Sequence, residues 1–535
     1  MALTLTVPDE GATSASDVET HPARLEEQLA QLPLLNAPDS RRSVYKLLSS
    51  LNRSEIDDER RLTLLELYRV PVDKICRELQ RQYLGQALPM NEKSKTAAGQ
   101  VRQLQVEMSF GYKRIVLNAA LRNDQPSAGK PATELIVAIQ RAIRYLTEIL
   151  VTSYQVYTSY PEGIWREIHQ LYTYAERNGA ADMPVADPLN DTVPNSSISH
   201  VYKQSVLVDL SNPYHLPARM TEKVRRYLDR WAPIAQLQAA TKYYDQKCQF
   251  LIDQQSDSGG QVYTREADVQ EPQRYRLLNS IELAQVIHQQ LTALRKGHEP
   301  DPKGLEVDFF TDDARDMLGR MIKVWGINPT RSFPRTDFKQ GDEVDVAIGI
   351  TWINYCVNGG KSFAPSTGAD ELECGETFLT DQTGYSSWVL RDESATGFAL
   401  AKAGVSEGSV RVGDLVATRS RTHDQAWGIG IVRWLKSTGP VDIEAGVSRL
   451  APTADPVAIK ILTDDHADGD FLPALLLPRI KTLNRTQRLV TYKGIFKPDR
   501  HLYLDDGEVG HKIRATKRIE ATDAFELFQF KLSEN

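Results

Sequence analysis

The stretch Gly428-Ile-Gly-Ile-Val-Arg-Trp434 lies in the part of the chain whose pattern decides the fold. It is a short run of β-forming residues, and similar runs occupy Val344–Ile348, Val412–Thr418 and Pro456–Leu462. Glycine-containing turns separate these runs, as at Gly439-Pro440. Many short strands punctuated by glycine turns indicate an antiparallel barrel or sandwich from about residue 328 onward.

The preceding half of the chain has a helical pattern instead. From Thr133 to Tyr157, apolar residues recur at three- and four-residue steps and place one stripe along a helix: Leu135, Ile139, Ile143, Leu146, Leu150 and Tyr154. A second helix is expected from Trp165 and a last one over Thr311–Val324. Loops rich in Asn, Asp, Pro and Gly interrupt the pattern, which is typical of a helical bundle or solenoid.

These patterns predict an α+β multidomain protein. Its predicted parts are a disordered tail (1–20), an all-α helical region (21–325), an antiparallel β-barrel (328–455) and a β-rich extension (456–535). The helical region is either one unit or two parts divided near 178–200. The extension is either a separate domain or a completion of the first barrel.

Composition narrows the class of protein. The chain has 535 residues, of which 41% are hydrophobic and 25% charged, and its net charge of -7 argues against general affinity for nucleic acid polymers. The four cysteines and ten histidines show no metal-ligand spacing, so no metal is expected. Neither a secretory signal nor a membrane-spanning segment is visible, and we expect a cytoplasmic location.

Two polar motifs stand out in the β-rich half. Arg331 and Arg335 lie four residues apart in Asn328-Pro-Thr-Arg-Ser-Phe-Pro-Arg335, and Asp392-Glu-Ser394-Ala-Thr-Gly397 follows downstream. Guanidinium groups present fixed charged forks to phosphate and to the acceptor edge of guanine. Each motif alone is weak, because an Arg-x-x-x-Arg is expected about once by chance in a chain of this length.

Their order, with a strand between them and further strands after them, resembles the PilZ domain, the bacterial receptor module for cyclic di-GMP. Arg331, Arg335, Asp392, Ser394 and Gly397 occupy the five positions of the family pattern Arg-x-x-x-Arg followed by Asp/Asn-x-Ser-x-x-Gly. The resemblance covers about residues 328 to 455 and leaves the helical half unassigned.

The resemblance implies a role for each of these residues. Arg331 and Arg335 would grip phosphate and the guanine Hoogsteen edge, and the Asp392 carboxylate would accept hydrogen bonds from guanine N1–H and N2–H. The Ser394 hydroxyl would add a polar contact, and Gly397 would permit a turn or a close approach. Thr330 and Trp434 are secondary candidates for contact with the ligand, although tryptophans of this region are more often core residues.

The spacing of the two motifs departs from the family pattern. Arg335 and Asp392 are 57 positions apart, since 392 minus 335 is 57, and this is wider than the family usually shows. The excess maps to an inserted segment at about 356–386, rich in Gly, Ser, Thr and Glu. An inserted surface loop is entropically tolerable, and it is in a position to cover or reshape the binding site.

The sequence therefore predicts a cyclic di-GMP-binding effector, not an enzyme, with no cofactor and with a protein partner engaged by the helical region. The alternative is a protein-interaction scaffold whose PilZ-like barrel binds no nucleotide. A third hypothesis is a single-strand-binding barrel that uses Arg419, Arg421, Arg433 and Trp434. An undetected enzyme activity ranks last, because no nucleophile-base pair or metal set is visible.

Overall fold

The computed structural model divides into two compact units, and each is described here by itself. Unit 1 comprises residues 1–86, 90–213 and 218–330, and unit 2 comprises 87–89, 214–217 and 331–535. The structure describes residues 3–533 except for 12–17, 33–36, 123–131, 191–192, 241–246, 265–268, 270, 298–311, 327–335, 339–340, 367–383, 405–408, 422–425, 440, 464–465 and 480–485.

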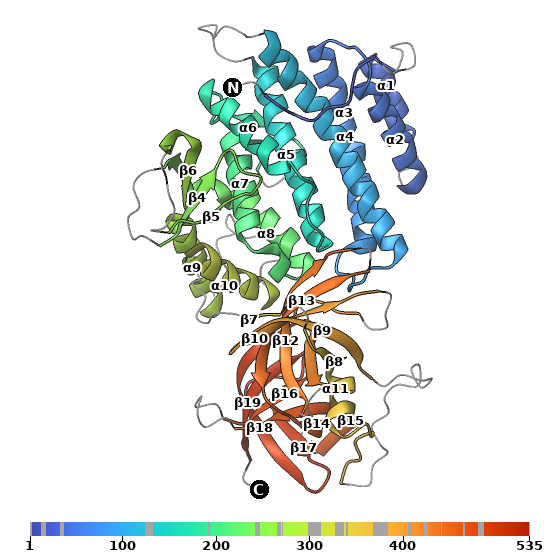
Figure 1. Cartoon of the computed structure of the whole chain (residues 1–535), viewed down its shortest axis with the longest axis vertical. Helices are drawn as coiled ribbons and strands as arrows, with labels where there is room; N and C mark the ends of the chain where they lie inside the picture. The colour runs from blue at the N-terminus through green and yellow to red at the C-terminus, as the bar shows by residue number, and fades with distance from the viewer. Residues whose placement is uncertain are drawn as a thin grey trace. The chain divides into compact units, whose positions relative to one another are not determined.

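Unit 1 is built mainly from helices (Figure 1). They are α1 (Pro22–Ala30), α2 (Ala37–Asn52), α3 (Asp58–Tyr83), α4 (Glu92–Arg122), α5 (Thr133–Gln155), α6 (Ile164–Arg177), α7 (Ile198–Leu210), α8 (Ala218–Trp231), α9 (Ile281–Arg295) and α10 (Asp312–Gly326). Helix α4 packs between α3 and α5, so these three long helices form the centre of the unit.

The helices begin where side chains can satisfy their first amide groups. The Asp57 carboxylate accepts a hydrogen bond from the backbone N–H of Arg60 at the start of α3. Helix α6 starts after Gly163, and its cap comes from a distant loop, because the Asp257 carboxylate accepts from the backbone N–H groups of Gly163 and Arg166. The predicted apolar stripe of α5 is buried along its whole length.

Part of the stretch predicted to be helical forms a sheet instead. Four short strands pair in the order β3-β6-β4-β5: β3 (Gln236–Ala239), β4 (Gln249–Asp253), β5 (Gln261–Val262) and β6 (Tyr275–Asn279). Two further strands, β1 (Val185–Ala186) and β2 (Asn195–Ser196), form a small pair. The predicted helical character of the N-terminal region is confirmed, but the prediction misses these strands, because strands of two to five residues are too short for a clear period-2 pattern.

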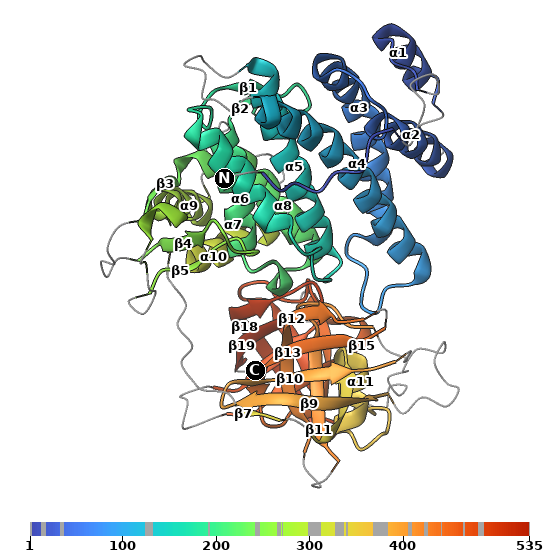
Figure 2. The same cartoon turned by 45° about the horizontal axis from the view of Figure 1, so that its top comes forward.

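The first barrel of unit 2 consists of strands β8 to β13. They are β8 (Glu343–Ile348), β9 (Ser386–Ser394), β10 (Gly397–Lys402), β11 (Leu415–Ser420), β12 (Gly428–Ser437) and β13 (Ile443–Ala451). The strand order is β10-β13-β12-β11-β8-β9, and β10 also pairs with β9, which closes the ring. The short strand β7 (Thr336–Asp337) adds to β9. Figure 2 shows β13, β10 and β9 as neighbours.

The second barrel is closed as well, so the β-rich extension forms a barrel of its own. Its strands are β14 (Asp455–Thr463), β15 (His466–Leu477), β16 (Arg488–Thr491), β17 (His501–Asp505), β18 (Gly510–Ala521) and β19 (Glu526–Leu532), in the order β14-β15-β16-β19-β18-β17. Strand β14 pairs with β17 and completes the ring. A tight turn follows β17, and its Gly507 has a φ of 92°, which glycine adopts without strain.

A shared apolar core joins the two barrels within unit 2. It includes Leu415 and Ile431 of the first barrel and Leu475 and Leu527 of the second, all essentially buried. Helix α11 (Ile350–Val357) packs into this core, and its Asn354 side-chain amide donates to the backbone carbonyls of Val457 and Ala474. The last two residues of α11 overlap the start of the predicted insertion at 356–386, and residues 367–383 of that segment lie outside the described residues.

Candidate ligand-binding face of the first barrel

The second sequence motif lies on a tight hairpin. Asp392 and Ser394 are at the end of β9, Gly397 opens β10, and two residues form the turn between the strands. Gly397 pairs with Ser394, and the Ser394 hydroxyl donates to the carbonyl oxygen of Gly397 over 3.1 Å. The turn suggested by the residue types is therefore present, and it fixes Asp392 and Ser394 on one strand.

Gly397 is required by a close approach between strands, not by an unusual turn conformation. A Cβ atom on residue 397 would lie 2.4 Å from the backbone oxygen of Val447 on β13. Gly397 is not among the glycines with positive φ that the structure describes. The backbone oxygen belongs to the sheet and cannot move cheaply, so any side chain would disturb the β10–β13 pairing.

A β-bulge turns the Asp392 side chain toward the outside of the barrel. Leu400 pairs with Leu390, whereas the preceding residue Ala399 pairs with Asp392, so β9 carries one extra residue at this point. Directly opposed residues share one face of a sheet. Leu400 is buried on the apolar face, and Asp392 therefore shares the opposite face with Ala399 and Ser394.

Four residues lie in one row across this outer face. Trp434 pairs with Gly446, Gly446 pairs with Ala399, and Ala399 pairs with Asp392. Because adjacent strands are about 4.8 Å apart, the two ends of the row are separated by roughly 14 Å. The Asp392 carboxylate thus lies at one end of the row, and the Trp434 indole comes from the other end and lies over Gly446. We name this set the outer row.

The tryptophans of this region differ in their surroundings. Trp388 and Trp427 are buried, as expected for core residues. Trp434 is only half-buried, and its indole lies over Gly446 on the outer row. Ala399 and Gly446 were not identified as site residues from the sequence. The available signal was Gly446 within the short run Ile443-Glu-Ala-Gly-Val447, because a glycine inside a strand indicates close approach of another group.

The first motif lies outside the described residues. Arg331 and Arg335 fall there, together with Thr330. The first described residue after Arg335 is Thr336, which begins β7 and pairs with Glu393, and Asp337 pairs with Asp392. The structure thus brings Asp392, Ser394 and Gly397 together and adds Trp434 to the same face. The arginine pair stays a prediction.

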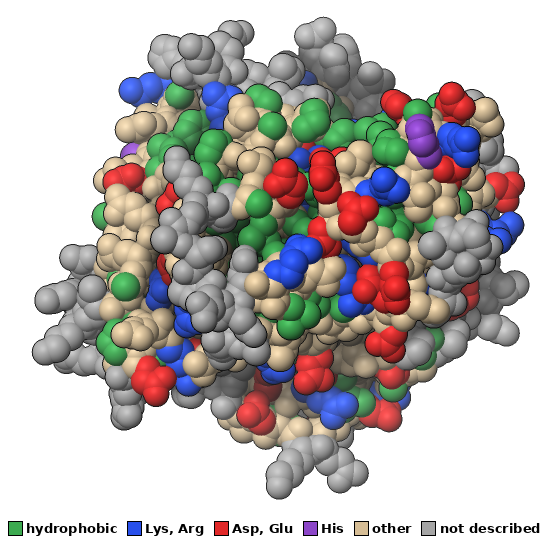
Figure 3. Space-filling model, turned by 90° about the horizontal axis from the view of Figure 1, so that it is seen from above, with side chains coloured by type: hydrophobic (Ala, Val, Ile, Leu, Met, Phe, Trp, Pro, Cys, Tyr) green, Lys and Arg blue, Asp and Glu red, His purple; other side chains and the backbone are tan. Residues whose placement is uncertain are grey.

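The arginines proposed for single-strand binding are engaged with carboxylates. Arg419 and Arg421 both pair with Asp345, at 3.0 and 2.5 Å, and Arg421 also pairs with Glu343. Arg433 pairs with Glu520. Among the coloured side chains of Figure 3, basic and acidic groups are interspersed on the face that is shown. Arginines that are neutralised by carboxylates do not favour binding of a polyanion.

The part of the chain that the structure describes was searched for metal sites and for membrane-spanning helices. Within it, no three His, Cys, Asp or Glu side chains lie close enough together to hold a metal ion. No helix there combines the length and the hydropathy that crossing a membrane requires.

The fold and the outer row define a class of protein. Its members have a helical region and a small four-stranded sheet, followed by two β-barrels. The first barrel carries polar residues on a hairpin at its outer face. Family comparisons agree with this class. Three models match in succession: "Cyclic-di-GMP receptor FimW, N-terminal domain" over residues 23–242, "Cyclic-di-GMP receptor FimW, middle PilZ domain" over 249–387 and 379–456, and "FimW C-terminal beta-barrel domain" over 457–533.

Residues 249–456 of the chain therefore contain a PilZ domain, which confirms the resemblance seen in the sequence. A relative from Pseudomonas aeruginosa, named "Cyclic-di-GMP receptor FimW", is 25% identical over 99% of this chain and 94% of its own length. No solved structure matches. The PilZ match begins at residue 249, ahead of the predicted 328, so the family's middle domain also includes β4 to β6, α9 and α10.

Proposed function

We propose that this protein is a cyclic di-GMP effector and that the outer row forms part of its nucleotide site. The Asp392 carboxylate accepts hydrogen bonds from guanine N1–H and N2–H, and the Ser394 hydroxyl lies two residues away on the same face. The Trp434 indole, which lies over Gly446 on the same row, offers an aromatic face on which a base can stack. The name of the Pseudomonas aeruginosa relative supports this ligand.

One observation carries the proposal. Arg335 is joined by a single peptide bond to Thr336, and Thr336 pairs with Glu393, the residue between Asp392 and Ser394. Consecutive Cα atoms are about 3.8 Å apart, so the residue that follows the arginine motif lies beside the second motif, although Arg335 and Asp392 are 57 positions apart in the sequence. This pairing supports the proposal that the two halves of the pattern form one site, with Arg331 and Arg335 as the phosphate and guanine ligands.

The proposed output is a change in how the helical region engages a protein partner. Cyclic di-GMP can shift the population between two conformations of the protein only if it binds one conformation more tightly than the other. The chain has no catalytic step in this account, since its task is recognition. The scaffold alternative, in which the barrel binds no nucleotide, predicts a partner whose binding is indifferent to cyclic di-GMP.

The arginine half of the site is tested by calorimetric titration of the full-length protein with cyclic di-GMP. Arg331→Ala and Arg335→Ala should each weaken binding by about tenfold or more, because each removes charge-assisted hydrogen bonds. Arg479→Ala, at an exposed position of the same unit, is the matched control and should bind as the wild type does. Normal binding by both arginine variants would refute the site.

A further inference from the structure

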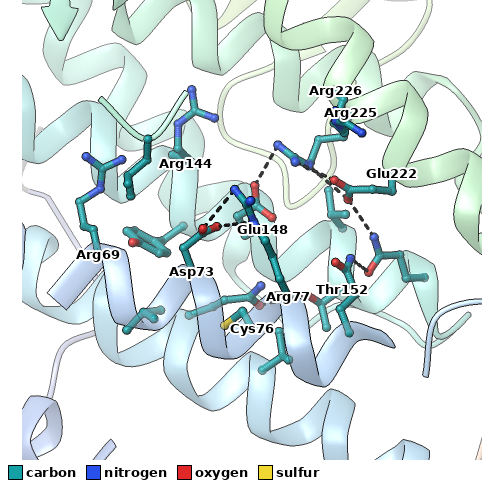
Figure 4. A pocket seen from close by; sticks show the side chains of 18 of the residues that line it. Arg69, Asp73, Cys76, Arg77, Arg144, Glu148, Thr152, Glu222, Arg225 and Arg226 are labelled. Atoms are coloured by element: carbon teal, nitrogen blue, oxygen red, sulfur yellow. Dashed lines mark hydrogen bonds and ion pairs between the residues drawn. The ribbon is translucent and has the colours of Figure 1, made fainter. Parts of the chain in front are cut away.

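The charged side chains that line the cavity of unit 1 balance one another (Figure 4). This cavity has a volume of about 590 Å³, and equal numbers of arginine and carboxylate side chains line it. Its ion pairs include Asp73 with Arg77 and Glu222 with Arg225. Because the two signs balance, the cavity favours neither an anionic nor a cationic ligand.

A different ion pair lies beside the outer row and joins the two barrels of unit 2. The Arg433 guanidinium on β12 donates two hydrogen bonds to the Glu520 carboxylate on β18, and the Nη2–Oε2 distance is 3.1 Å. Arg433 is the extra residue of a β-bulge, because the register of β12 against β13 shifts between Val432 and Trp434. Arg433 is thus the sequence neighbour of the residue that ends the outer row.

The Arg433 side chain also reaches the row of residues that contains Ser394. Its Nε donates to the Ser448 hydroxyl over 2.9 Å. Ser448 pairs with Gly397, and Gly397 pairs with Ser394, so this row runs beside the outer row at a spacing of roughly 7 Å. Two strand spacings, roughly 10 Å, separate Ser448 from Ser394. The Arg433 guanidinium therefore lies on the same outer face of the barrel as Asp392 and Ser394.

The carboxylate partner of Arg433 can be replaced at small cost. The Glu520 side chain is 23% exposed and that of Arg433 is 33% exposed, so a released Glu520 carboxylate would be hydrated. Arg419 and Arg421 differ in this respect, because both pair with Asp345. The Asp345 side chain is 5% exposed and would be left as a buried charge. Of these three arginines, Arg433 is the one whose partner can be exchanged for a ligand.

We propose that Arg433 is a further ligand of cyclic di-GMP and that a phosphate of the nucleotide replaces Glu520 as its partner. A guanidinium group binds a phosphate with the same pair of parallel hydrogen bonds that it gives to a carboxylate. This role rests on the proposed nucleotide site, because Asp392 and Ser394 must hold the ligand on this face.

The exchange links ligand binding to the contact between the two barrels, since Glu520 belongs to the second barrel and Arg433 to the first. The ion pair and the phosphate compete for one guanidinium. Whatever strengthens the contact between Arg433 and Glu520 therefore weakens ligand binding, and bound ligand weakens that contact by the same factor.

The test is calorimetric titration of full-length variants with cyclic di-GMP. Glu520→Gln removes the competing charge and should tighten binding about two- to fivefold, a gain that damage to the fold does not produce. Arg433→Ala should weaken binding at least about fivefold, because it removes charge-assisted hydrogen bonds to phosphate. In the double variant Arg433→Ala/Glu520→Gln the gain from the second substitution should vanish, because the competition requires both side chains.

Asp523→Asn is the matched control for Glu520→Gln. Asp523 lies in the same barrel and pairs with Lys493, so its substitution removes one negative charge without freeing Arg433 and should leave the affinity unchanged. Unchanged or weaker binding by Glu520→Gln, or an equal gain in Asp523→Asn, would overturn the competition while leaving the nucleotide site in place. A wild type that does not bind cyclic di-GMP would overturn the nucleotide site and the role of Arg433 together.

Discussion

The indole of Trp434 lies directly over Gly446, its partner on the neighbouring strand β13. A Cβ atom on residue 446 would be 1.7 Å from the indole Nε1, so the ring occupies the space that any side chain would need. We predict that Gly446→Ala displaces the indole and lowers the free energy of unfolding by about 1–3 kcal/mol. Urea denaturation followed by tryptophan fluorescence measures both effects.

Gly428→Ala is the control for that substitution. It lies on the same strand as Trp434, and the nearest atoms to its added Cβ would be at ordinary contact distance, 3.7 to 3.9 Å. The control should change stability by less than about 1 kcal/mol. Equal effects of the two variants would contradict the placement of the indole.

The second prediction concerns Gly397. Gly397→Ala should destabilise unit 2 by about 1–3 kcal/mol, because its Cβ meets the backbone oxygen of Val447, which the sheet holds in place. Ser394→Ala removes only the hydrogen bond to the Gly397 carbonyl and should cost about 1 kcal/mol or less. Thermal and urea unfolding of the two variants compares these costs. A harmless Gly397→Ala would show that the strands do not approach so closely.

The third prediction concerns the indole itself. Stacking of a base on an aromatic side chain contributes about 1–3 kcal/mol by alanine substitution. Trp434→Ala should therefore weaken cyclic di-GMP binding about five- to hundredfold, and Trp434→Phe should retain most of the affinity. Calorimetric titration measures the effect. Unchanged affinity of Trp434→Ala would show that the ligand does not extend along the outer row as far as β12.

The fourth prediction concerns pH and a buried histidine of unit 1. His169 Nδ1 lies 2.8 Å from the Tyr202 hydroxyl and Nε2 lies 2.8 Å from the carbonyl of Ser258, so a neutral imidazole can both accept and donate here. Burial lowers the pKa of His169 to about 4, against 6.5 for an ordinary histidine.

Between these two pKa values the unfolded chain binds more protons than the folded protein does. The stabilisation from neutral His169 is therefore complete above about pH 6.5 and is lost as the pH falls toward 4, by about 2–3 kcal/mol. His169→Gln should remove this part of the pH dependence, as measured by urea unfolding from pH 4 to 7. His288→Gln, on the exposed side of α9, should keep the wild-type slope. A wild-type slope in His169→Gln would refute this explanation.

The strands of both barrels could be predicted where they are long and rich in β-formers. The predicted strands at 344–348, 428–434 and 456–462 match β8, β12 and β14 to within a few residues. Helix α11 could not be predicted in this way. Its sequence Ile-Thr-Trp-Ile-Asn-Tyr-Cys-Val has the composition of a strand, and burial between the two barrels decides its conformation.

The three residues Asp392, Ser394 and Gly397 could be proposed from the sequence, because their spacing and their order after the arginine pair resemble the PilZ pattern. Their relation to Trp434 could not be, because it depends on the register of four strands and on the bulge before Asp392. A shift of one residue would turn Asp392 to the opposite face. The sequence also left open why residue 397 is a glycine, because a turn and a close approach between strands both require one. The position of the Val447 backbone oxygen shows that the close approach is the reason.

The central claim is that cyclic di-GMP binds on the outer row through Asp392. Its most direct test is a calorimetric titration of the full-length wild type, Asp392→Ala and Glu393→Ala with cyclic di-GMP. Glu393 is the adjacent residue on the opposite face, where it pairs with Arg449, and it serves as the matched control. The wild type should bind, Asp392→Ala should bind at least about tenfold more weakly, and Glu393→Ala should stay within about threefold. No wild-type binding at ligand concentrations on the order of tens of micromolar, or wild-type affinity in Asp392→Ala, would contradict the account.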